Sequence, residues 1–190
     1  MGKAALLIID MQNDFVLEKS PHHVPGAQAV VPKIQAVLAE FRRRAMPVFH
    51  IVRVHRADGS DVEIFRKDRF KTHPYGVSGT RGAAVIDDLA PRPGEYVLEK
   101  IRMSAFIGTE LDLMLRTLGV TTVFVAGIQT PNCIRTTVFD AMAYNYPAVL
   151  VDDATGAASK EIHHANVRDM QNIGVRIATA ADVGGMLETS

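Results

Sequence analysis

Short runs of apolar residues alternate along this 190-residue chain with stretches of helical periodicity. The runs are continuous and contain few polar residues, which is typical of strands covered on both faces in a parallel sheet. Crossovers in such sheets are nearly always right-handed, so we predict an α/β fold with three layers, α/β/α, doubly wound around a six-stranded parallel sheet in the Rossmann-like manner. The six predicted strands are 4–10, 47–54, 96–99, 122–128, 148–151 and 175–179.

Four segments carry the pattern of a helix. Residues 28–44 place their apolar side chains in one stripe, as a helix packed on a sheet requires. Three further helices are predicted where a residue suited to N-capping precedes a helical pattern. These helices span 110–118, 133–144 and about 160–172, and their predicted caps are Thr109, Asn132 and Ser159.

The composition excludes several classes of protein. Apolar residues make up 47% and charged residues 22%, so the chain is globular and not disordered. Lys and Arg total 21 and Asp and Glu total 21, which argues against nucleic acid or membrane as a partner. The single cysteine precludes an internal disulfide, and neither a bilayer-spanning run nor a secretory signal is recognised. We therefore expect one cytoplasmic domain over residues 1–190.

Residues 55–82 interrupt this pattern. They show no sustained periodicity, carry many charges and include four glycines. A connection of this length inside a compact domain is typically a lid, a binding loop or an oligomer contact. A plain surface connection is an equally good interpretation of the sequence.

Three chemically different side chains follow three of the predicted strands: Asp10, Lys100 and Cys133. The carboxyl ends of parallel strands share one edge of the sheet, so these groups are expected on the same side. Cys133 lies in the first turn of a predicted helix, where the helix dipole and Lys100 would favour the nucleophilic thiolate. Asp10 is suited to accept the thiol proton and return it to a leaving amine. Backbone amides near Gln129 and Cys133 are suited to hold an oxyanion.

Simpler interpretations stand beside this one. A lone cysteine is often a small buried hydrophobe, Asp10 is equally suited to a salt bridge, and Lys100 to the surface. Carboxylates at strand ends also suit Mg²⁺-dependent phosphoryl transfer, although the glycines of 76–82 lack the spacing of a phosphate-binding loop. The carboxylates considered for that alternative are Asp10, Asp14, Asp152 and Asp153.

Three segments match a known family in order along the chain. They are LIIDMQNDF at 7–15, KIRMSAF at 100–106 and GIQTPNCIR at 127–135, and residues 140–141 and 152–154 fit the remaining pattern. The sequence thereby resembles the isochorismatase-like cysteine hydrolases, a superfamily that includes nicotinamidases, N-carbamoylsarcosine amidohydrolases and ureidoacrylate hydrolases. This resemblance implies the isochorismatase-like hydrolase fold.

The resemblance also implies an activity. A cysteine hydrolase of this family cleaves a C–N bond of a small amide or ureido (carbamoyl) compound through a thioester acyl-enzyme. Carried over by position, the catalytic triad is Asp10, Lys100 and Cys133. A non-proline cis peptide is implied between Ile128 and Gln129, so that the amides of Gln129 and Cys133 form the oxyanion hole.

Four further residues are candidates for substrate binding. By resemblance, Phe15 and Phe106 line a small pocket and Gln12 supports it from behind. Arg53 ends the second predicted strand, where its guanidinium is suited to clamp a substrate carboxylate. Pairing of Arg53 with an acidic residue of the following segment is the alternative.

Departures from the family patterns narrow the prediction. Nicotinamidases hold a metal with an aspartate and histidines after the second strand. Residues 48–55 of this chain contain no aspartate. His50 and His55 are an odd number of positions apart, so on a strand they face opposite sides. We therefore expect no metal or other cofactor.

The cysteine bears on the type of reaction. True isochorismatases cleave a vinyl ether and lack the cysteine, so Cys133 favours C–N hydrolysis. Vinyl-ether hydrolysis and a non-catalytic binding module remain alternatives. The expected partners are a small-molecule substrate and further copies of the chain, as a homodimer or homotetramer.

Overall fold

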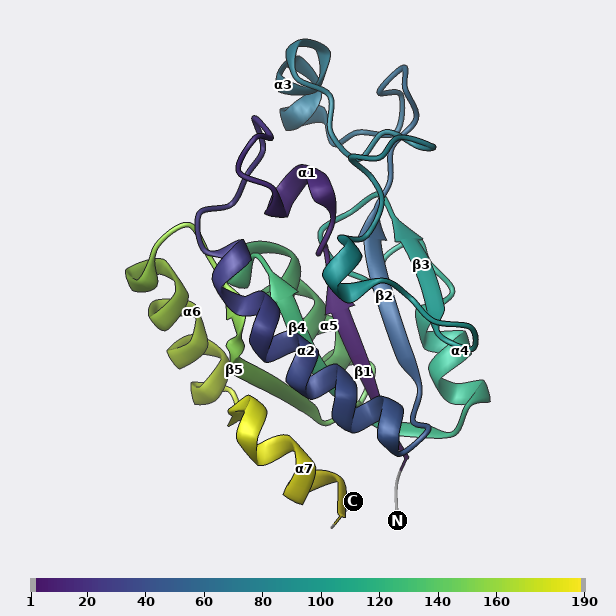
Figure 1. Cartoon of the computed structure of the whole chain (residues 1–190), viewed down its shortest axis with the longest axis vertical. Coiled ribbons are helices and arrows are strands. Elements are labelled where there is room, and N and C mark those ends of the chain that lie inside the picture. The colour runs from purple at the N-terminus through teal and green to yellow at the C-terminus, as the bar shows by residue number, and fades with distance from the viewer. Residues whose placement is uncertain (1–2, 189–190) are drawn as a thin grey trace.

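The computed structural model describes residues 3–188, in which a six-stranded sheet lies between two layers of helices (Figure 1). The strand order is β3-β2-β1-β4-β5-β6, and every neighbouring pair is parallel. The predicted doubly wound α/β fold is confirmed. The strands are β1 (Lys3–Ile9), β2 (Val48–Arg53), β3 (Tyr96–Lys100), β4 (Val120–Ile128), β5 (Ala148–Gly156) and β6 (Arg176–Ala178).

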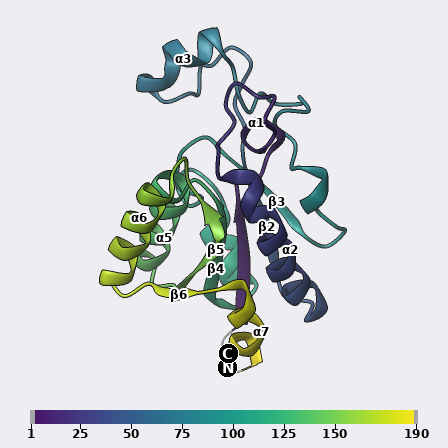
Figure 2. The ribbon, with the colours of Figure 1, turned by 60° about the vertical axis from the view of Figure 1, so that its left-hand side comes forward.

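Each face of the sheet packs against its own group of helices (Figure 2). One core lies under α2 (Ala27–Arg43) and α7 (Ala180–Glu188). The other lies under α4 (Leu111–Thr117), α5 (Arg135–Ala143) and α6 (Lys160–Asn172). The central strands β1 and β4 are buried between both groups, which explains their unbroken apolar sequences. Within residues 3–188, no helix has the length and apolar character needed to traverse a bilayer.

The structure confirms some of the predicted helix N-caps and corrects others. Ser159 caps α6 as predicted, because its Oγ accepts a hydrogen bond from the N–H of Ile162 at 3.2 Å. Asn132 is not an N-cap, which corrects the prediction. The chain leaves β4 through a π-helical turn (Thr130–Ile134, η3) and α5 begins only at Arg135. Helix α4 begins at Leu111, one residue later than predicted, and Thr109 Oγ1 accepts a hydrogen bond from the Leu111 N–H at 3.3 Å.

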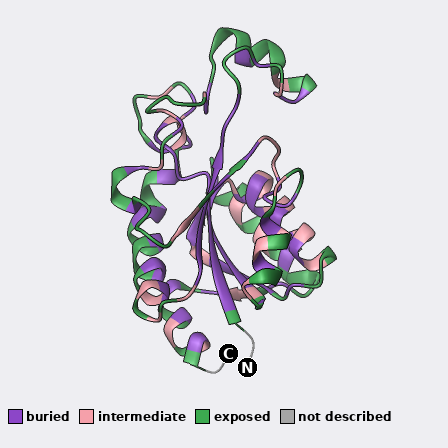
Figure 3. Cartoon of the chain, turned by 90° about the vertical axis from the view of Figure 1, so that its right-hand side faces the viewer, coloured by how far each residue is buried: buried purple, intermediate pink, exposed green. Residues whose placement is uncertain are grey.

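Residues 54–95, between β2 and β3, form an excursion that we name the β2–β3 segment. It contains α3 (Lys67–Thr72) and two short 3₁₀ turns, Ile64–Arg66 (η1) and Asp87–Leu89 (η2). Its tip stands away from the sheet beyond the strand ends and is largely exposed (Figures 1 and 3). Near the sheet it lies close to α1 (Asn13–Val16), which follows β1. The segment therefore overhangs the edge at which the parallel strands end.

A few close contacts fasten the β2–β3 segment. The N–H of Gly76 donates to Asp14 Oδ2 at 2.8 Å, and the N–H of His55 donates to the Gly76 carbonyl at 2.7 Å. Gly76 has φ +57°, and a Cβ there would lie 2.5 Å from the Arg53 carbonyl oxygen. Glycine is required at this position because both the backbone conformation and the close approach exclude a side chain.

Candidate active site

The ends of β1 and β4 meet where the strand order reverses, the usual place for a site in this architecture. Asp10 follows β1 directly in the left-handed region, with φ +54°, and its N–H donates to the Ile51 carbonyl at 2.9 Å. Beside it, Gly127 of β4 has φ +114°, and a Cβ there would lie 2.2 Å from the Ile9 carbonyl oxygen. This close approach brings Asp10 beside the turn that carries Cys133.

Asp10 and Lys100 form a buried ion pair. Lys100 Nζ, at the end of β3, donates to Asp10 Oδ2 at 2.9 Å and to the Arg102 carbonyl at 3.2 Å. The other carboxylate oxygen, Asp10 Oδ1, is buried and makes no hydrogen bond to any residue in the described part of the chain. One oxygen of Asp10 is therefore held in place, and the second is left to accept a proton.

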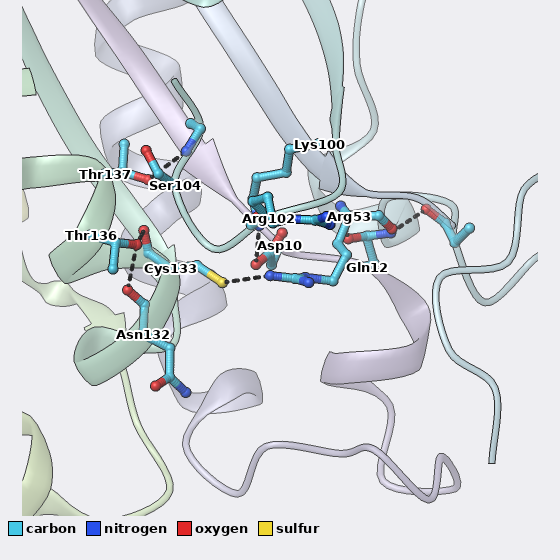
Figure 4. Close-up of polar contacts among 12 residues, drawn as sticks. Asp10, Gln12, Arg53, Lys100, Arg102, Ser104, Asn132, Cys133, Thr136 and Thr137 are labelled. Atoms are coloured by element: carbon cyan, nitrogen blue, oxygen red, sulfur yellow. Dashed lines mark hydrogen bonds and ion pairs between the residues drawn. The ribbon is translucent and has the colours of Figure 1, made fainter. Parts of the chain in front are cut away.

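Cys133 lies in the π-helical turn and is 7% exposed, with its sulfur beside Arg53 (Figure 4). The Arg53 Nη2 atom is 3.7 Å from Cys133 Sγ. Burial raises the pKa of the Cys133 thiol, the Asp10 carboxylate raises it further, and Lys100 and Arg53 oppose both effects. Burial and Asp10 thus oppose the thiolate that the sequence led us to expect, whereas Lys100 favours it as expected. A thiol whose pKa is raised needs a base to react as a thiolate, and Asp10 is the adjacent one.

Arg53 pairs with an acidic residue of the following segment, which was one of the two interpretations that the sequence left open. Its buried guanidinium pairs with Glu63, Nη1 to Oε1 at 2.9 Å, and also reaches the sulfur of Cys133. Gln12 fixes the backbone of Arg53: its Oε1 accepts from the Arg53 N–H at 2.7 Å, and its Nε2 donates to the Arg53 carbonyl at 2.8 Å. Gln12 is fully buried and acts through Arg53 rather than at the cavity wall.

The site opens into a cavity of about 370 Å³. The peptide bond between Ile128 and Gln129 is cis, and both residues line the cavity. Phe15 lines it too, but Phe106 does not, which corrects the prediction for Phe106. The remaining lining residues are Asp10, His22, Val24, Arg53, Phe65, Arg66, Arg69, Tyr75, Asn132 and Cys133.

Phe106 is drawn away from the cavity by its own segment. The N–H of Ala105 donates to Thr137 Oγ1 of α5 at 3.0 Å, which ties this stretch to the helix layer. The Phe106 ring then stacks with Tyr144 and Tyr146, with centroid separations of 5.2 and 6.1 Å. Phe106 is therefore a core residue.

The residues that could hold a metal do not come together. Within residues 3–188, no group of three or more His, Cys, Asp or Glu side chains is arranged to bind an ion. His55 is buried with Nδ1 3.2 Å from Asp61, and His50 is buried with Nε2 2.8 Å from Glu95. The acidic residues considered for Mg²⁺ are separately engaged: Asp14 with Gly76, Asp152 with His163, and Asp153 with Lys33. The donor set does not fit a nicotinamidase-type metal centre.

Sequence reasoning missed several lining residues, including the polar residues His22, Arg66, Arg69 and Tyr75. His22 and Tyr75 are both buried, at 8% and 4% exposed. Arg66 and Arg69 come from the start of the α3 region. The only sequence signal was the density of charge within 55–82, which indicated a binding loop but not which of its residues face the site.

Comparisons with known proteins agree on one family. A family model described as "Isochorismatase domain" matches residues 4–182. A protein of Arabidopsis thaliana named "probable inactive nicotinamidase" is 46% identical over 179 residues, which cover 92% of this chain and 91% of that protein. The maleamate amidohydrolase of Pseudomonas putida is 34% identical over 174 residues, covering 90% of this chain and 80% of that protein. The crystal structure of an isochorismatase family protein from Desulfovibrio vulgaris superposes with a TM-score of 0.95 at 44% identity, covering 99% and 100% of the two chains.

Proposed function

This chain belongs to the isochorismatase family, and on that premise we propose that it is a cysteine hydrolase that cleaves a C–N bond of a small amide or ureido compound. The observation that carries the proposal is the buried ion pair of Lys100 with Asp10, whose carboxylate lines the same cavity as Cys133. The similarity to a maleamate amidohydrolase supports the reaction class.

The first half of the reaction forms a thioester. Asp10 takes the proton of the Cys133 thiol, and the sulfur attacks the substrate carbonyl carbon as its π electrons move to oxygen. The N–H groups of Gln129 and Cys133 hold the resulting oxyanion, a contribution of roughly 3 kcal/mol per donor in measured enzymes. Asp10 then delivers its proton to the nitrogen, the C–N bond breaks, and ammonia or an amine leaves.

The second half returns the enzyme. Asp10 takes a proton from a water molecule, whose oxygen attacks the thioester carbon. The C–S bond breaks and the sulfur recovers the proton, releasing the acid product. Lys100 keeps Asp10 oriented at the start of each half, and Arg53 offsets the negative charge that develops on the sulfur.

The test is ammonia release from a panel of small amides and ureides by wild-type protein and by Cys133→Ala and Asp10→Asn. Each variant is expected to lose about 10³-fold or more in kcat/KM. Glu99→Gln is a matched control, because Glu99 precedes Lys100 on β3 but is exposed. Ammonia release that survives Cys133→Ala would contradict the proposal.

A second candidate is a non-catalytic binding module, favoured by the relative named an inactive nicotinamidase. The intact set of Asp10, Lys100 and Cys133 argues for turnover instead. Iodoacetamide separates the two, because this chain has a single cysteine and any alkylation is at Cys133. Alkylation that abolishes ammonia release supports the hydrolase, whereas a protein with no turnover of any amide, alkylated or not, supports the binding module.

A further inference from the structure

One wall of the cavity carries hydrogen-bond donors that the protein itself does not satisfy. The wall comes from the loop after α1 and from the β2–β3 segment, away from the strand ends. We name its four polar residues the donor subsite: His22, Arg66, Arg69 and Tyr75.

The tautomer of His22 follows from its neighbour. Arg69 Nη2 lies 3.5 Å from His22 Nδ1, and a guanidinium can only donate, so Nδ1 is the acceptor. Burial lowers the pKa of His22, and the charge of Arg69 lowers it further, so the ring is neutral at pH 7. A neutral ring that accepts at Nδ1 carries its proton on Nε2. This Nε2 is buried without a hydrogen-bond partner among residues 3–188.

Tyr75 presents a second unused donor. Its ring packs against His22, with centroids 5.1 Å apart, and against Phe15, with centroids 6.0 Å apart. The side chain is 4% exposed, and its hydroxyl finds no hydrogen-bond partner in the described residues. An unpartnered buried hydroxyl costs roughly 1–3 kcal/mol.

The two arginines of the donor subsite form no direct ion pair within residues 3–188. Neither Arg66 nor Arg69 has a carboxylate within 4.0 Å in the described part of the chain. Of the neighbouring acids, Glu63 is held by Arg53 and Asp14 by the Gly76 N–H. Arg66 lies over the Phe65 ring, 5.4 Å from its centroid. Arg53 differs from both, because Glu63 already neutralises its charge.

Together these observations favour a ligand that carries several hydrogen-bond acceptors and a negative charge. We infer that the donor subsite binds a carboxylate of the substrate, so that the enzyme prefers acid amides or acid ureides to uncharged ones. A planar carboxylate offers about four lone-pair directions, enough for the guanidinium, hydroxyl and imidazole donors at once. The inference rests on the proposed function, because it names the class of substrate for that reaction.

The first experiment needs no turnover. Iodoacetate and iodoacetamide both alkylate the single cysteine, with C–S bond formation and loss of iodide, but only iodoacetate carries a carboxylate. Glutathione serves as a reference thiol with no binding site. For Cys133, we expect the ratio of the alkylation rate with iodoacetate to the rate with iodoacetamide to be about tenfold higher than the same ratio for glutathione, because unpaired cations concentrate an anionic reagent. The Arg66→Gln/Arg69→Gln variant should lose this excess and keep its rate with iodoacetamide.

The control removes the same charge from the same helix. Lys67 and Lys71 are exposed on α3 and do not line the cavity, so Lys67→Gln/Lys71→Gln should keep the wild-type ratio. The proposed carboxylate subsite would be contradicted if the alkylation-rate ratio of the wild type equalled that of glutathione. It would also be contradicted if the arginine and lysine double variants lowered this ratio equally. Failure of both reagents to reach Cys133 would overturn it too, since the cavity would then be closed to small acids.

The second experiment compares matched substrates: N-carbamoylglycine and succinamate against their uncharged methyl esters. Wild-type protein should favour each acid about tenfold in kcat/KM, and Arg66→Gln/Arg69→Gln should abolish that preference through KM. An ester preferred by the wild type would contradict the inference while leaving the hydrolase intact. Conversely, absence of turnover on every compound would count against the proposed function, and the alkylation ratio would still decide the subsite.

Discussion

We name Asp10, Lys100 and Cys133 the strand-end centre. Its charged side chains are paired with each other, whereas two arginines of the β2–β3 segment form no ion pair in the described residues. At the strand ends, Lys100 and Asp10 are buried and paired at 2.9 Å, so each requires the other. In the segment, Arg66 and Arg69 have no carboxylate within 4.0 Å in the described residues and line the cavity. The groups that we propose to take part in the reaction are thus part of the folded core. The groups that would select a substrate are carried on a surface excursion and are free to vary without loss of the fold.

The sharpest test of this contrast is removal of a cation from each region. Lys100→Met leaves the Asp10 carboxylate buried and unpaired, which should lower the free energy of unfolding by about 3–5 kcal/mol in urea titrations. Adding Asp10→Asn should restore most of that stability but no activity. Arg66→Gln, by contrast, should change the free energy of unfolding by less than about 0.5 kcal/mol. Equal stability losses at Lys100 and Arg66 would remove the distinction.

A second test examines the root of the β2–β3 segment, where Glu95 rejoins the sheet. Burial alone would raise the pKa of Glu95, but hydrogen bonds from Arg42, the Arg92 N–H and His50 lower it to about 2, from 4.5. The folded-state pKa is depressed, so the stabilisation is complete above about pH 4.5 and is lost as the pH falls towards 2. Glu95→Gln should therefore cost at most about 3 kcal/mol at pH 7.

Thermal or urea unfolding at several pH values measures this effect. The difference between wild type and Glu95→Gln should shrink steadily between pH 4.5 and 2, and kcat/KM for any substrate should hold constant. Glu99→Gln, four residues further along the chain and exposed, provides the control. A stability difference independent of pH would mean that the charge of Glu95 plays no part.

The sequence predicted the strand-end centre well because its information is local. Continuous apolar runs indicate buried parallel strands, and parallel strands end at a common edge, so Asp10 and Lys100 were expected on the same side. The protonation state of Cys133 was not predictable, because it sums burial and three neighbouring charges in space. The π-helical turn also has no sequence periodicity that distinguishes it from a capped helix.

The donor subsite lay beyond sequence reasoning for a different reason. His22 and Tyr75 are more than fifty residues apart and meet only because the β2–β3 segment folds back over α1. No repeating pattern records such a contact in an irregular connection. Phe106 shows the reverse error, since a motif position alone does not reveal that Thr137 ties the neighbouring Ala105 to the helix layer.

Arg53 belongs to both regions and gives the smallest of these effects. It ends β2, pairs with Glu63 of the β2–β3 segment, and lies 3.7 Å from Cys133 Sγ. Its positive charge lowers the pKa of the thiol, so Arg53→Gln should raise that pKa and move the pH profile of iodoacetamide alkylation to higher pH.

The double variant Arg53→Gln/Glu63→Gln distinguishes two roles of Arg53: the effect of its charge on the thiol, and its role in holding Glu63 and the segment in place. It removes the buried carboxylate that the single variant leaves unpaired, so it should recover stability and retain the alkaline shift of alkylation. A profile that returns to that of the wild type would show that Arg53 acts only by holding Glu63 and the segment. A persistent shift, with a roughly tenfold slower reaction at pH 7, would place Arg53 with the reacting groups rather than with the substrate-selecting wall.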